Sequence, residues 1–178
     1  MKVFQGSPQN TDQLSDNEKL IYGLLDELHI EYKRVEHEAV FTVAESQSVA
    51  ELLEPAKHCK NLFLCPFNKS QYYLLVMPAE KKFASGSVSR QIHSSRLQFA
   101  SDEDLAACLQ LKSGSVGALA LAMDKDKKVQ LLVDKAVLTA EYVSSHPGVN
   151  TASIALKTTD LFSKYLPATG HDYIVVEC

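Results

Sequence analysis

The sequence lacks the short motifs that mark many metal-dependent and nucleotide-dependent enzymes. Its four cysteines, Cys59, Cys65, Cys108 and Cys178, include no Cys-x-x-Cys pair. Together with the histidines they match no zinc or iron-sulfur spacing. There is no Gly-x-Gly-x-x-Gly, Walker or Gly-x-Ser-x-Gly motif, so the nucleotide-triphosphate and serine-hydrolase classes have no support. We therefore expect no metal and no cofactor.

Long apolar runs and a targeting segment are also missing. No apolar run approaches the about 20 residues that cross a bilayer. The N-terminus does not combine basic residues, an apolar core and a cleavage site. With the scattered cysteines, this favours a soluble protein of the reducing cytoplasm that does not bind membranes.

Length and charge set further limits. A chain of 178 residues with 46% hydrophobic content suits one buried core. The net charge of −4 argues against the coating of DNA or of other nucleic acid along its length. Basic residues in the middle third would still permit docking of one end of a polyanion; they are Lys57, Lys60, Lys81, Lys82, Arg90 and Arg96.

The N-terminal part of the chain changes character after its first residues. Residues 1–13 are polar and aperiodic, which predicts a flexible arm, and residues 14–178 are expected to form the domain. A Ser or Thr with Glu three positions later opens the ranges 15–28 and 42–53. This capping box, with apolar residues at helical spacing, predicts two helices.

The middle of the chain predicts a buried hairpin. Its apolar runs 62–64 and 72–77 are separated by the turn-forming residues 68–70. Further strands are expected at 129–133 and 173–176. Since helices and strands alternate with short connections, we expect one compact α/β domain with a mixed central β-sheet flanked by helices.

Two other segments are less regular. Ser101 followed by three acidic residues predicts the start of a helix that ends near Ser113 and Gly114. The small apolar residues 116–123 are compatible with either a buried strand or a tightly packed loop.

Lys60 and Asn61 stand at the start of the first hairpin strand. There a cation can be held partly desolvated against a ligand, although a lysine that only solubilises a strand end would look the same. A second candidate site is the segment 144–151. Its Pro-Gly turn lets His146 and Asn150 project from a loop.

Together these two places suggest a chemistry. Lys60, Asn61, His146 and Asn150 could hold an ester carbonyl and a terminal nucleotide while water attacks. A Cys59 nucleophile with a histidine partner is an alternative, but a cysteine beside an apolar run is more often a core residue.

Four motifs, in order, resemble the YbaK/prolyl-tRNA synthetase-associated domain family, and within it the free-standing PrdX/ProX branch. The similarity runs from about Glu18 to Val176. The motifs are VEHEAVFTVAE at 35–45, KNLFL at 60–64, HP followed by VNTA at 146–152, and DLF with ATGH at 160–171.

The resemblance implies a compact α/β domain that hydrolyses mischarged aminoacyl-tRNA. The essential lysine of the family matches Lys60, and its site histidine matches His146 in the His-Pro-x-x-Asn pattern. Phe41 and Thr42 match residues that border the pocket. The expected substrate is Ala-tRNA(Pro), bound by its acceptor end, and prolyl-tRNA synthetase is expected as a transient partner.

One loop departs from the family. Where relatives show Gly-x-Val-x-Pro, this chain has Gly114, Ser115, Val116, Gly117 and Ala118. We expect backbone N–H groups of this loop and His146 to orient the substrate carbonyl, in a loop that is less rigid without proline. The alternatives are an inactive tRNA- or synthetase-binding module and a deacylase for cysteinyl or seryl esters.

Overall fold

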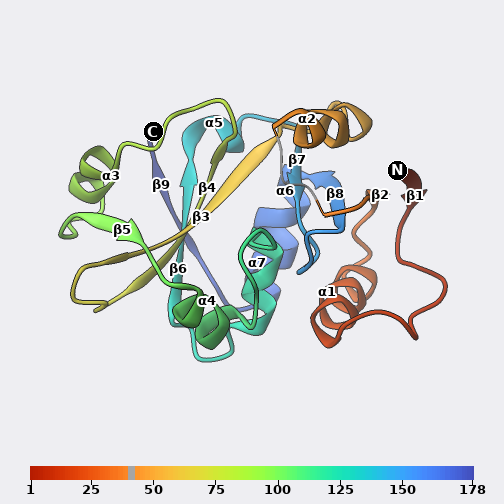
Figure 1. Cartoon of the computed structure of the whole chain (residues 1–178), viewed down its shortest axis with the longest axis horizontal. Coiled ribbons are helices and arrows are strands. Elements are labelled where there is room, and N and C mark those ends of the chain that lie inside the picture. Colours follow the sequence, from red (N-terminus) through yellow and green to blue (C-terminus); the bar gives the residue numbers. More distant parts are fainter. Residues whose placement is uncertain (40–42) are drawn as a thin grey trace.

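The larger of two sheets forms the centre of the molecule in the computed structural model, which describes residues 1–39 and 43–178 (Figure 1). In spatial order it contains β5 (Leu97–Phe99), β3 (Cys59–Pro66), β4 (Tyr72–Pro78), β6 (Val129–Asp134) and β9 (Tyr173–Val176). β3 pairs antiparallel with β4 and β5, and β6 pairs parallel with β4 and β9. The expected α/β fold with a mixed sheet is confirmed.

A smaller sheet, which we did not predict as a separate unit, lies beside it. It contains β1 (Lys2–Gln5), β2 (Tyr32–Glu36), β8 (Ala152–Lys157) and β7 (Tyr142–Ser145), paired antiparallel in that order. An isolated bridge between Lys57 and Val143 joins the two sheets just before β3. This junction places the start of β3 next to β7.

The predicted hairpin is formed by β3 and β4. In its register Lys60 lies opposite Met77, and Leu62 opposite Leu75. The residues of β3 change from partly buried at 60–62 to fully buried at 63–66. Only residues 60–62 of the strand, which follow the buried Cys59, are partly exposed, and this leaves the Lys60 side chain able to reach solvent.

Helices and turns connect the strands. They are α1 (Asp16–Glu27), α2 (Val43–Leu52), α3 (Ser85–Gln91), α4 (Asp102–Leu109), the 3-10 helix η1 (Ala118–Met123), α5 (Lys135–Leu138), α6 (Thr158–Asp160), the π-helical turn η2 (Leu161–Tyr165) and α7 (Leu166–Ala168). The predicted cap of Ser15 on α1 is present, and so is that of Ser101 on α4. Thr42, the expected cap of α2, lies outside the described residues.

Three expectations need correction. Residues 2–5 form the edge strand β1 and not a loose arm, since they pair with β2. Residues 118–123 form η1, neither a strand nor a loop. Helix α4 ends at Leu109 and not near Gly114, because Gln110 takes a left-handed conformation with φ 54°.

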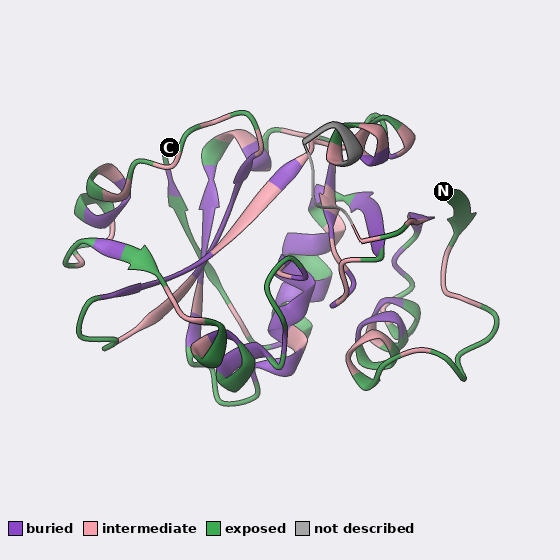
Figure 2. Cartoon of the chain, viewed as in Figure 1, coloured by how far each residue is buried: buried purple, intermediate pink, exposed green. Residues whose placement is uncertain are grey.

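The main core lies between the sheets and the helices that cover them (Figure 2). Ile21 and Leu25 of α1 share it with Leu119 of η1 and Ile154 of β8, and none of the four is exposed. In the part of the chain that the structure describes, no helix has the length and apolar character needed to span a bilayer.

Candidate active site

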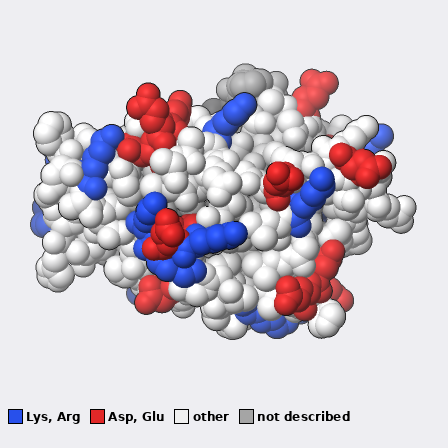
Figure 3. Space-filling view, turned by 90° about the horizontal axis from the view of Figure 1, so that it is seen from below, with Lys and Arg blue, Asp and Glu red and all other residues white. Residues whose placement is uncertain are grey.

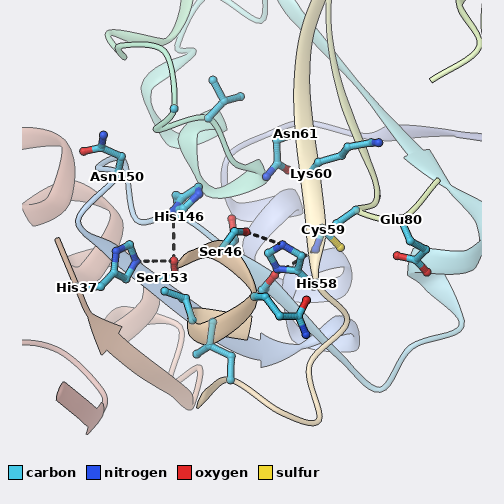
Figure 4. A pocket seen from close by; sticks show the side chains of 18 residues that line it. His37, Ser46, His58, Cys59, Lys60, Asn61, Glu80, His146, Asn150 and Ser153 are labelled. Atoms are coloured by element: carbon cyan, nitrogen blue, oxygen red, sulfur yellow. Dashed lines mark hydrogen bonds between the residues drawn. The ribbon is translucent and has the colours of Figure 1, made fainter. Parts of the chain in front are cut away.

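A cavity of about 700 Å³ opens where the two sheets meet (Figure 4). Its walls come from the start of β3, from α2, from the end of β7 with the loop that follows, and from the loop after α4. These segments are far apart in sequence, and the bridge between Lys57 and Val143 brings two of them, the start of β3 and β7, together. The cavity therefore depends on how the sheets are joined.

Most of the residues predicted from sequence meet in this cavity. Its lining includes Lys60, Asn61, Gly114, Val116, His146 and Asn150. Ser115 and Gly117 belong to the same loop but lie behind it, both buried. Phe41 and Thr42 fall outside the described residues.

The glycines after α4 allow their loop to pack closely on the His146 segment. A Cβ at Gly117 would lie 2.6 Å from Ser145 Oγ and 3.0 Å from the His146 backbone nitrogen. Gly114 has φ +86°, and a Cβ there would lie 3.8 Å from Asn150 Nδ2. Only a glycine at 117 fits this approach, so the two loops form one continuous wall.

Lys60 extends along the edge of the cavity, away from His146 (Figure 4). Its ammonium group donates a hydrogen bond to the backbone carbonyl of Lys81. The Lys81 side chain is itself held by both carboxylate oxygens of Asp134, at 2.9 Å each.

Neighbouring lysines differ from Lys60 in their pairing. Lys57 binds Glu80 at 2.5 Å, and this bond lowers the pKa of the Glu80 carboxyl. Lys81 is paired with Asp134. Within residues 1–39 and 43–178, Lys60 makes no salt bridge, so its charge is left for an anion from outside the protein.

His146 is anchored by one side of its ring. Its Nδ1 lies 3.0 Å from the Ala152 carbonyl oxygen and 3.4 Å from Ser153 Oγ. Burial lowers the pKa of His146, and the nearby imidazoles of His37 and His58 lower it further.

Several cavity residues escaped the sequence analysis. His37 Nε2 lies 2.9 Å from Ser153 Oγ, and Ser46 Oγ lies 3.0 Å from His58 Nε2. Burial lowers the pKa of His58. The signals available were weak: His37 stands inside the first family motif and His58 two positions before Lys60, whereas nothing in the sequence distinguished the serines.

Ser145 presents an unused polar group. The residue is 6% exposed and lines the cavity, yet among the described residues its hydroxyl finds no hydrogen-bond partner. A buried hydroxyl without a partner costs about 1–3 kcal/mol. The wall beside His146 therefore carries hydrogen-bonding capacity that the folded protein does not use itself.

Cys59 is held as a thiol. Burial raises its pKa to about 12, and its sulfur donates to the Lys57 carbonyl at 3.4 Å. A nucleophile must be a thiolate, so this environment argues against the cysteine alternative. Within the described ranges, no three His, Cys, Asp or Glu side chains gather as a metal site would require.

The fold and the cavity define an α/β protein with a pocket between two sheets. The model of the aminoacyl-tRNA editing domain matches residues 37–163, a range that includes Lys60 and His146. The chain belongs to the aminoacyl-tRNA editing domain family.

Two relatives extend the likeness over most of the chain. The prolyl-tRNA editing protein ProX of Acetoanaerobium sticklandii is 31% identical over 163 residues, which cover 91% of this chain and 98% of that protein. The prolyl-tRNA synthetase associated domain-containing protein 1 of Mus musculus is 33% identical over 156 residues, 85% of this chain and 90% of that protein.

Solved structures agree on the fold. A protein described as a candidate trans-editing enzyme for prolyl-tRNA synthetase superposes with a TM-score of 0.67, covering 93% of this chain and 99% of its own. Its identity of 18% limits this comparison to architecture.

Proposed function

We propose that this protein is an editing hydrolase that cleaves the ester bond of a mischarged aminoacyl-tRNA, with Ala-tRNA(Pro) as its substrate. The observation that carries the proposal is the meeting of Lys60 and His146, the two residues that match the family motif, in one cavity. Similarity to a prolyl-tRNA editing protein over 91% of the chain supports the choice of substrate.

The cavity offers suitable groups for each part of such a substrate. Lys60 has no carboxylate partner among the described residues, so it can neutralise a phosphate at the acceptor end. Asn61 and Asn150, which both line the cavity, add amide groups. Because Cys59 is held as a thiol, water is the attacking group.

The proposed binding partner is the acceptor end of the aminoacyl-tRNA. Prolyl-tRNA synthetase is proposed as a second, transient partner. Seen from below, basic and acidic side chains alternate over a largely uncharged face (Figure 3). Mixed charge and a net charge of −4 do not favour binding of tRNA along its length, so the proposed contact is with its acceptor end. We propose that the protein acts in the cytoplasm, where charged tRNA is used in translation.

Replacement of Lys60 tests the proposal. Lys60→Ala should lower kcat/KM for Ala-tRNA(Pro) by about 10²-fold, since a charge-assisted contact to the substrate is lost in a partly desolvated site. Release of labelled alanine from charged tRNA measures the rate. Lys82→Ala is the matched control, because Lys82 is exposed and lies outside the cavity lining. A folded Lys60→Ala protein with wild-type rates would refute the assignment.

A further inference from the structure

The proposed hydrolysis needs a group that accepts a proton from the attacking water, and the hydrogen bonds of His146 identify one. His146 Nδ1 lies 3.0 Å from the carbonyl oxygen of Ala152. A carbonyl oxygen only accepts, so Nδ1 must carry a hydrogen. A neutral imidazole has a single N–H, and its other nitrogen, Nε2, therefore presents a lone pair.

The surroundings of His146 favour this neutral form. Burial lowers its pKa, and the titratable groups that act on it are the imidazoles of His37 and His58, which lower it as well. Among the described residues, none donates to or accepts from Nε2, and His146 lines the cavity. His146 Nε2 is thus a hydrogen-bond acceptor that faces the cavity. In this form it cannot donate a hydrogen bond to the substrate carbonyl, the role that we expected from the sequence.

A second contact points the same way. His37 Nδ1 lies 2.7 Å from the Glu38 carbonyl oxygen, so this nitrogen also carries a hydrogen. In neutral His37, Nε2 then accepts from the Ser153 hydroxyl, 2.9 Å away. The lone pairs of Ser153 Oγ are left to face His146 Nδ1–H at 3.4 Å.

These contacts form a row of hydrogen bonds from His37 through Ser153 to His146. A backbone carbonyl oxygen accepts at each end of the row, Glu38 beside His37 and Ala152 beside His146. Figure 4 shows Ser153 between the two rings, with a dashed line to each. Ser153 is 5% exposed, so water does not readily replace its hydroxyl. When His146 takes up a proton, the Ala152 carbonyl oxygen and Ser153 Oγ, both of which face Nδ1–H, would stabilise the imidazolium.

We propose that His146 Nε2 is the general base of the reaction, and that Ser153 and His37 are positioning residues that fix its tautomer. This inference rests on the proposed function. Water attacks the ester carbonyl carbon and passes a proton to Nε2. The carbon–oxygen bond to the tRNA then breaks, and the departing ribose oxygen takes that proton. The products are the free amino acid and uncharged tRNA.

Kinetics of variants test the base. His146→Gln should lower kcat for Ala-tRNA(Pro) by about 10²–10⁴-fold, the usual contribution of a general base, and should remove the fall of kcat at low pH. Ser153→Ala should give a smaller loss and a shifted acid limb, and Ser153→Thr, which keeps the hydroxyl, should restore both. His93→Asn, at an exposed histidine outside the cavity, is the matched control.

An NMR measurement on the wild-type protein separates this inference from the proposed function. Nitrogen-15 spectra should show His146 protonated at Nδ1 and titrating below the ordinary histidine value of 6.5. If the wild-type protein deacylates its substrate but His146 is protonated at Nε2, the general-base role is refuted and the proposed function stands. Full kcat in a folded His146→Gln variant would have the same meaning. A wild-type protein that deacylates no aminoacyl-tRNA overturns the proposed function, and the base role with it.

Discussion

Gly117 shows how one missing side chain shapes the site. It does not line the cavity, yet its backbone supports the segment that carries His146. Its φ of −162° is ordinary extended backbone, so the need for glycine comes from space and not from conformation. Its role is therefore to let two loops approach each other.

Gly117→Ala should impair deacylation. The new Cβ would meet Ser145 Oγ at 2.6 Å and the His146 nitrogen at 3.0 Å, and the His146 segment would have to move. Displacement of a reacting group by about 1 Å can cost up to about 10²-fold in rate, so we expect a loss of at least about tenfold in kcat. Single-turnover deacylation measures it.

Gly86→Ala is the control for this substitution. A Cβ at Gly86 meets nothing within 4 Å, and alanine is the better helix former in α3. This variant should keep the wild-type rate. Equal rates for Gly117→Ala and Gly86→Ala would show that the packing on His146 does not matter for the reaction.

The sequence identified those residues of the site that stand at a strand start or in a turn. Lys60 and Asn61 open a strand, and His146 stands in a Pro-Gly turn, so both places were predictable from local pattern. Ser153 and His37 could not be found in this way. They are separated by 116 positions and meet only because β2 and β8 pair.

At the scale of elements, apolar pattern predicted β3, β4 and β6, because their runs are long and bounded by turn residues. The segment 118–123 was ambiguous, since alanine and leucine in a short run suit a strand, a loop or a helix. The smaller sheet was missed for another reason. Its strands are short, and its order is set by pairing between distant segments.

Helix α5 depends on a carboxylate at its start. Asp134 is fully buried and accepts from the Ala136 backbone nitrogen at 2.8 Å and from the Cys178 nitrogen at 2.9 Å, besides binding Lys81. Burial opposes its ionisation, but these donors outweigh burial and hold the pKa of Asp134 below its usual range.

Asp134→Ala should lower the free energy of unfolding by about 2–4 kcal/mol, from the lost helix cap and the charge-assisted bonds. Urea unfolding at neutral pH measures the change. Since the pKa of Asp134 is lowered on folding, its contribution is present above its unfolded value and disappears as the pH falls through the folded value. The difference between variant and wild type should therefore shrink in acid.

A matched acid provides the control. Asp126 forms an ion pair with Lys128, and its side chain is 72% exposed. Asp126→Ala should change the free energy of unfolding by less than about 1 kcal/mol at any pH. If both substitutions had the same small effect, Asp134 would not hold the structure in the way its contacts indicate.

At the scale of the whole molecule, the cavity is a product of two sheets joined at one edge. Lys57 binds the Tyr142 carbonyl and the Ser144 nitrogen through its backbone, and so ties the start of β3 to β7. Lys60 comes from one sheet, and His146 follows a strand of the other. The motifs of the site lie far apart in the sequence, and the joining of the two sheets brings them together. The site therefore forms only in the folded molecule.

Specificity should follow from the shape of this cavity. An editing enzyme must admit alanine and spare correctly charged proline, and a difference of one or two methylene groups gives only about 1–3 kcal/mol of discrimination by binding. Exclusion of proline must then be steric, and we expect it at the wall formed by the Gly114 loop and the His146 segment, which line the cavity. Small aminoacyl esters should react fastest.

A panel of alanyl-, seryl-, cysteinyl- and prolyl-tRNA under identical conditions measures this selectivity. We expect kcat/KM to be greatest for the alanyl ester and lowest for the prolyl ester, by about tenfold or more. Uncatalysed decay of each ester, followed without protein, is the baseline. If the prolyl ester reacted as fast as the alanyl ester, editing would destroy correctly charged tRNA and the proposed substrate would be wrong. A reaction confined to the seryl or cysteinyl ester would keep the family chemistry and change the amino acid that it removes.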